Sequence, residues 1–190
     1  MVSLKNDEYG IAQKLFSEKR FDEAYPLYEK LAHDGDPRCQ VFVGWMCHEG
    51  LGVGKSKERA FCWFQGAARL GSRVGAFYCG KLALAESDYK EALRWFLQAA
   101  MQEYGPALLW LGLLHIRGLG VQVDIERGAQ YLERAVKTGN FPAEREIALL
   151  MLRGKLGARR IPTGLILFPY AFIKALVNGV VIGHSDKLMG

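Results

Sequence analysis

The chain has 190 residues, of which 50% are hydrophobic and 24% charged, a composition typical of a globular protein with a sizeable core. Its formal net charge is only +5, from 25 basic and 20 acidic residues distributed along the sequence. Nucleic-acid binding would call for a dense basic stripe with interleaved aromatic residues. The composition therefore argues against a disordered chain, and we expect no nucleic-acid partner.

Small residues recur along the chain in two interleaved series. The first series advances in steps of 36, 32 and 36 residues, at Ala24, Ala60, Ala92 and Gly128. The second series runs half a repeat out of phase, at Ala12, Gly44, Gly80, Gly112 and Ala148. Periods of about 20 to 50 residues are typical of solenoids, whose units bury their apolar faces against their neighbours. Two small positions in each repeat predict two helices, because a small residue lets helix axes approach to about 8 to 10 Å.

In chain order, the first predicted hairpin has helices over 9–19 and 21–34, where apolar residues recur at three- and four-residue spacing. The next helix is predicted over 37–49. Pro37 suits its first position, and Gly50 can close its end in the left-handed conformation.

The second helices of later repeats carry predicted N-caps four residues before the small position, where a side-chain oxygen can accept an unpaired amide hydrogen. These residues are Ser56, Asp88 and Asp124. Glu91 follows Asp88 at the spacing of a capping box.

The connection between the two helices of a repeat is predicted in two lengths. Small positions within a repeat lie 12 residues apart in the first and third repeats and 16 apart in the second and fourth. Both longer connections contain Gly-Leu-Gly-Val, beginning at Gly50 and Gly118.

The first of these connections continues as Gly-Lys-Ser, but it is not a phosphate-binding loop, because Glu49 occupies the position of a required glycine.

The sequence contains no recognisable catalytic or metal-binding constellation. Its four histidines share no spacing that would build a metal face, and its four cysteines form no CxxC pair. We therefore expect a non-catalytic protein without a metal or other cofactor. Cys39, Cys47, Cys62 and Cys79 are predicted to be small, buried thiols in a reducing compartment, and a disulfide between helices is the alternative.

The repeated pattern resembles the Sel1-like repeat family, a branch of the tetratricopeptide-type helical repeats. The residues that carry it are Gly44, Gly50-Leu-Gly-Val, Ala60, Trp63, Ala67-Ala68 and Gly71, then Gly112, Gly118-Leu-Gly-Val, Asp124, Tyr131, Ala135 and Gly139. The resemblance covers about residues 9–154, although the first and third repeats lack the Gly-x-Gly-Val turn. It implies an all-α fold, a right-handed superhelical solenoid of antiparallel helix pairs (an α/α superhelix), that serves as a protein-interaction scaffold.

We expect repeats at about 9–35, 37–71, 73–104 and 105–139, a divergent fifth from 141, and a repeat domain that ends near residue 157. Exposed tryptophan and tyrosine are favoured anchors at interfaces. The candidate residues for binding a protein partner are Trp45, Tyr78, Tyr104 and Trp110. Packing in the core is the alternative for each tryptophan.

Residues 158–190 form an apolar segment, predicted to be a C-terminal cap or a membrane-associating segment. Ile161–Gly183 spans 23 residues with the single charge Lys174, and Arg153, Lys155, Arg159 and Arg160 precede it. About 17 to 25 apolar residues can cross a bilayer, and cytosolic flanks are commonly basic. Gly164, however, continues the 36-residue step from Gly128, as a fifth hairpin would.

Three alternatives for this segment stay open: a cap packed on the preceding helices, with or without an extension into a homodimer contact, peripheral insertion into a membrane, and a true span. Pro162 and Pro169 disfavour an uninterrupted helix in each case. The candidate membrane or dimer contacts are Phe168, Tyr170, Phe172 and Ile173. The first ten residues lack the apolar core of a signal peptide, so we expect a cytoplasmic protein, with peripheral membrane attachment left open.

Overall fold

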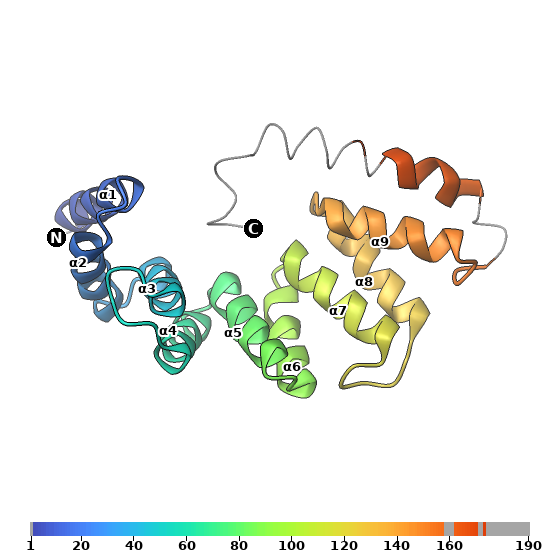
Figure 1. Ribbon diagram of the computed structural model, residues 1–190, viewed down its shortest axis with the longest axis horizontal. Coiled ribbons are helices and arrows are strands. Elements are labelled where there is room, and N and C mark those ends of the chain that lie inside the picture. The colour runs from blue at the N-terminus through green and yellow to red at the C-terminus, as the bar shows by residue number, and fades with distance from the viewer. Residues whose placement is uncertain (1, 158–161, 171–172, 174–190) are drawn as a thin grey trace. The chain divides into compact units, whose positions relative to one another are not determined.

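The computed structural model describes residues 2–157, 162–170 and 173, and every regular element in these ranges is helical (Figure 1). The helices are α1 (Val2–Ser17), α2 (Phe21–His33), α3 (Pro37–Glu49), α4 (Lys57–Arg69), α5 (Arg73–Ala85), α6 (Tyr89–Ala100), α7 (Gly105–Arg117), α8 (Ile125–Lys137) and α9 (Phe141–Leu152). A further helical segment covers residues 162–170. The prediction of an all-α repeat fold is confirmed.

The chain divides into two compact units, Met1–Ser87 and Asp88–Gly190. In the first unit each helix from α1 to α5 packs on the next, and α5 also touches α3. In the second unit α6 packs on α7, α7 on α8 and α8 on α9. Helices thus contact mainly their neighbours in sequence, which is the packing order of a solenoid.

Side-chain caps begin the second helices where the sequence predicts them. The side chains of Ser56, Asp88 and Asp124 accept hydrogen bonds from the amides three residues later, at 3.1, 3.1 and 2.8 Å. The Glu91 carboxylate, predicted to complete a capping box, accepts a hydrogen bond from Arg94 at 2.9 Å. These bonds pair amides that have no carbonyl partner within the helix, and so they fix where each helix begins.

The two lengths of connection end their preceding helices in different ways. The short connections turn at Lys19 and Ser87, whose φ angles are +61° and +60°. The long connections turn at Gly50 and Gly118, at +79° and +67°. Because Lys19 leaves the helical region, α1 ends at Ser17 and not at residue 19 as predicted, and it begins earlier, at Val2.

Each long connection bonds back to the first helix of its own hairpin and also lies against the preceding repeat. The amides of the capping residues Ser56 and Asp124 donate to the carbonyls of Cys47 and His115, at 2.8 and 2.9 Å. A Cβ atom on Gly120 would lie 2.8 Å from the Cβ of Tyr89 at the start of α6. Only glycine fits at such a backbone contact, and so the connection lies directly against the preceding second helix.

Small residues allow the two helices of a hairpin to pack closely. A Cβ atom on Gly44 would lie 2.7 Å from the ring of Phe64, which closes the contact between α3 and α4. A Cβ atom on Gly112 would lie 2.8 Å from the Leu132 side chain and 2.9 Å from the Gly128 carbonyl oxygen, between α7 and α8. The predicted role of the small positions is therefore confirmed in these hairpins.

The turn after each second helix needs a left-handed backbone. Gly35, Gly71 and Gly139 have φ angles between +84° and +87°, and Glu103, at the equivalent position, has +51°. The Glu103 carboxylate accepts a hydrogen bond from Arg134 at 2.6 Å. We expect Gly71→Ala to lower the free energy of unfolding by about 1 kcal/mol, because a Cβ disfavours this conformation.

The matched control is Gly54→Ala. Neither Gly54 nor Gly71 has an atom within 4 Å of an added Cβ, but only Gly71 has a positive φ. Urea denaturation of both variants isolates the conformational cost, and equal stabilities would contradict the explanation.

Candidate partner-binding surface

Three stacked aromatic pairs join the second helix of one repeat to the first helix of the next. Phe42 stacks on Tyr28 with ring centroids 4.9 Å apart, and Tyr78 stacks on Phe64 at 4.8 Å. Trp110 stacks on Phe96 at 6.2 Å, with an interplanar angle of 12°. The three pairs occupy equivalent repeat positions, so this contact belongs to the architecture of the solenoid.

In each pair one ring is buried and the other is partly exposed. Tyr28, Phe64 and Phe96 have essentially no accessible surface, whereas Phe42, Tyr78 and Trp110 are partly exposed. A partly exposed ring that is fixed from behind loses little conformational freedom when a ligand covers it. These positions can therefore both hold the repeats together and present an aromatic surface.

In the first unit, α3 and α5 together present what we call the α3–α5 face: Phe42, Trp45, Glu49, Tyr78 and Lys81. Trp45 is partly exposed, and its ring lies 5.7 Å from that of Phe16. Burial raises the pKa of Tyr78, and the nearby Glu49 carboxylate raises it further. Burial lowers the pKa of Lys81. The face thus combines aromatic rings with one acidic and one basic group.

The predicted partner-binding residues fall into both units. Trp45 and Tyr78 lie on the neighbouring helices α3 and α5, and Trp110 occupies on α7 the position that Tyr78 has on α5. Tyr104 is the N-cap residue of α7 and is partly exposed. Sequence reasoning missed Phe42, although its spacing of 36 residues from Tyr78 could have revealed the shared position.

The predicted membrane or dimer contacts lie at the C-terminal end of the described chain. Phe168 is partly exposed, Tyr170 and Ile173 are exposed, and Phe172 lies outside the described residues. Most of the apolar run after residue 170 is also outside them. Across the helices that the structure does describe, none combines the length and hydropathy needed to cross a bilayer.

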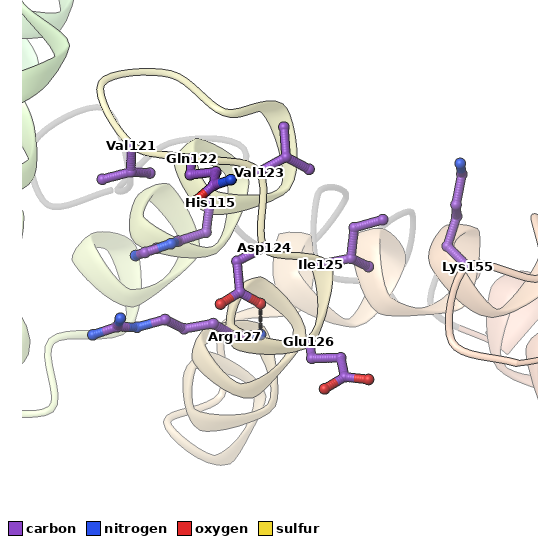
Figure 2. Close-up of a pocket in the computed structure, with 9 residues that line it drawn as sticks. All are labelled: His115, Val121, Gln122, Val123, Asp124, Ile125, Glu126, Arg127 and Lys155. Carbon is purple, nitrogen blue, oxygen red and sulfur yellow. Dashed lines mark hydrogen bonds between the residues drawn. The ribbon is translucent and has the colours of Figure 1, made fainter.

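A hollow of about 650 Å³ lies beside the connection between α7 and α8 (Figure 2). Its lining residues are His115, Val121, Gln122, Val123, Asp124, Ile125, Glu126, Arg127 and Lys155. The Asp124 carboxylate is already used as the cap of α8, where it accepts the Arg127 amide hydrogen. The lining includes no serine, threonine, cysteine or tyrosine, and so it offers no hydroxyl or thiol nucleophile.

His115 is the one buried titratable side chain of this lining, with 7% of its surface exposed. Its ring stacks on Tyr131 with centroids 5.5 Å apart, and its Nδ1 atom has no hydrogen-bond partner among the described residues. Burial lowers the pKa of His115, and the Arg127 guanidinium lowers it further against the opposing effect of Asp124. The imidazole is therefore neutral at pH 7 and packs as an aromatic ring.

Other reactive chemistry is equally sparse. In the ranges that the structure describes, no group of three histidine, cysteine or acidic side chains could hold a metal ion. All four cysteines are free thiols, and three of them are buried, whereas Cys62 is exposed. Burial raises the pKa of Cys39 to about 12, so this thiol is not a nucleophile at neutral pH.

The lowered pKa of His115 makes stability depend on pH. The unfolded chain takes up a proton near pH 6.5, whereas the folded imidazole takes one up only at lower pH, so the free energy of unfolding falls as the pH drops below 6.5. We expect His115→Phe, which keeps a ring against Tyr131, to lose less stability than the wild type when the pH falls from about 7.5 to about 5, a range that contains the titration of an unperturbed histidine. Parallel slopes in urea denaturation would contradict this assignment.

These features define an α-helical repeat protein of the tetratricopeptide type, and the Sel1 repeat family model matches residues 37–72, 73–104 and 105–140. The chain belongs to the Sel1 repeat family. The fold of this family generally serves as a scaffold for protein interactions.

Known relatives are consistent with this assignment. A Sel1 repeat protein from Oxalobacter formigenes has 25% identity and a TM-score of 0.81, with 87% of this chain and 69% of that one covered. The protective antigen c5321 of uropathogenic Escherichia coli, which has an SLR fold, gives 26% identity and a TM-score of 0.81 over 90% of this chain and 38% of its own. The uncharacterized protein NMB1327 of Neisseria meningitidis is 31% identical over 129 residues. This chain aligns with 67% of its length to only 27% of that relative.

Proposed function

We propose that this protein is a non-catalytic adaptor that holds a partner polypeptide against the first helices of its repeats. The observation that carries the proposal is the set of partly exposed aromatic rings on α3, α5 and α7, each packed against a buried ring, and Trp45 on α3 is packed in this way against Phe16. Tryptophan and tyrosine in such positions are the usual hot spots of protein interfaces.

The α3–α5 face is the part of the proposed surface with the fullest chemistry. Trp45 and Tyr78 offer apolar contact area, while Glu49 and Lys81 offer one group of each charge. Such a face suits a peptide segment with apolar side chains between polar ones. Because the backbone here is held by helix packing, binding would order the peptide more than the protein.

The chemistry of the hollow beside α7 favours a binding role over a catalytic one. The neutral His115 ring is stacked on Tyr131, and the Asp124 carboxylate caps α8. A general base needs a nearby nucleophile or substrate proton to act on, and the lining residues provide no hydroxyl or thiol nucleophile.

The adaptor proposal is tested by affinity capture with the variant Trp45→Ala. Removing a hot-spot tryptophan costs about 2 kcal/mol or more, which corresponds to at least a roughly 25-fold loss of affinity. We therefore expect partner recovery from an extract of the source cells to fall sharply, as measured by quantitative mass spectrometry. Purified partner and titration calorimetry then give the change in Kd.

Trp63→Ala is the matched control. Trp63 is also partly exposed, but it lies on the second helix α4, with its ring 4.9 Å from that of His33. Circular dichroism establishes that both variants remain helical. Full recovery with folded Trp45→Ala, or equal losses with both variants, would refute the assignment of the surface.

A further inference from the structure

One side of the helical segment 162–170 packs against α9, and the opposite side is exposed. Gly164 is buried against α9, where an added Cβ would lie 2.9 Å from the Met151 Cβ. The opposite side of the helix extends from Leu165 to Tyr170, an arc of about 140° around the helix axis at 3.6 residues per turn. This exposed arc carries Leu165, Ile166, Pro169 and Tyr170, and Ile173 lies on its continuation. Its side chains are apolar except for the Tyr170 hydroxyl, and the exposed Thr163 lies at its edge.

Part of this arc lies at positions that are mostly buried in the earlier repeats. The position after the small residue is Tyr25, Phe61, Leu93, Ala129 and Leu165 in successive repeats. Tyr25, Leu93 and Ala129 are buried and Phe61 is partly exposed, whereas Leu165 is 62% exposed. Phe168 likewise is partly exposed at a position where its four counterparts are buried.

The rest of the arc is apolar at positions that earlier repeats leave exposed or partly exposed. The counterparts of Ile166 are Pro26, Cys62, Arg94 and Gln130, and those of Tyr170 are Lys30, Gly66, Gln98 and Arg134. Ile166 is 74% exposed, Tyr170 58% and Ile173 59%. One further stacked helix would cover Leu165 and Phe168 and part of Tyr170, but it would leave Ile166 in water, as the counterparts of Ile166 are in earlier repeats. The arc therefore suits a broad apolar environment better than a single helix.

Charge is concentrated at the same end of the chain. Residues 1–146 contain 19 basic and 19 acidic residues, and Asp186 and Lys187 cancel. The whole excess of +5 thus comes from residues 147–185, which contain Arg153, Lys155, Arg159, Arg160 and Lys174 and no acid. Arg153 and Lys155 are exposed in the turn that follows α9.

We propose that the exposed arc of 162–170 and 173, with the basic residues Arg153 and Lys155, is a docking surface for an anionic lipid bilayer. Apolar side chains enter the boundary between headgroups and acyl chains, while neighbouring basic groups are attracted to anionic lipids. Two copies of the chain would instead bring two segments of like charge together, which opposes self-association through this surface. The segment lies in the interface and does not cross it.

The test is flotation of the full-length protein with two kinds of vesicle. One contains phosphatidylcholine and phosphatidylserine at about 3:1, and the other contains phosphatidylcholine alone. We expect binding to the anionic vesicles only, with release as salt is raised, because screening shortens the reach of exposed charges to about 10 Å at 0.1 M. Ile166→Glu should reduce the bound fraction about tenfold, since a carboxylate resists entry into an apolar layer. Arg153→Ser with Lys155→Ser should weaken binding mainly at low salt.

Met101→Glu is the matched control, because Met101 is 84% exposed in the turn after α6 and lies outside the proposed surface. This variant should bind vesicles as the wild type does. Absence of binding by the wild type, or equal binding by Ile166→Glu, overturns the proposal. A lipid-free dimer in sedimentation velocity that Ile166→Glu converts to a monomer overturns it in favour of a second copy as the occupant.

Discussion

Close contact at small residues sets the geometry of the hairpins, and between α7 and α8 the two backbones themselves touch. In the pair formed by α7 and α8, a Cβ atom on Gly112 would lie 2.9 Å from the Gly128 carbonyl oxygen, and one on Gly128 would lie 2.8 Å from the Gly112 carbonyl oxygen. Side chains then fill the space beside this crossing, as Leu132 does. Because two backbones in contact cannot slide without a clash, the crossing fixes which residues of each helix face outward.

The aromatic surface follows from that constraint. With the hairpins fixed, the ring at the position of Phe64 lies between its own first helix, at Gly44, and the next repeat, at Tyr78. One buried ring therefore serves two interfaces. The same arrangement explains why Tyr78 and Trp110 cannot be classed as either core or surface: one side of each ring packs within the solenoid, and the rest stays accessible.

The repeat pattern was sufficient to predict the fold because it acts locally and recurs. Caps at Ser56 and Asp124 and the small contacts at Gly44 and Gly112 depend only on near neighbours, so residue type and spacing reveal them. Glu103 is different. It adopts the left-handed conformation of its glycine counterparts, and only the structure shows this, together with the long-range bond from Arg134.

The candidate site was less predictable than the fold. Trp45, Tyr78 and Trp110 were identified by residue type, which cannot tell a ring that packs on another from one that faces solvent. Phe42 was passed over for the same reason, although it shares the position of Tyr78 and Trp110. The excess of positive charge, which the totals suggest is spread along the chain, is confined to residues 147–185.

The alternation of short and long connections gives the chain a period of 68 residues, twice the average repeat. Lys19 and Ser87, which turn the short connections, are 68 residues apart, and so are Gly52 and Gly120 in the long ones. Each long connection rests on the start of a second helix that follows a short one. The modular unit for lengthening or shortening this protein by design is accordingly a pair of hairpins, since excising a single hairpin would place a long connection against the wrong neighbour.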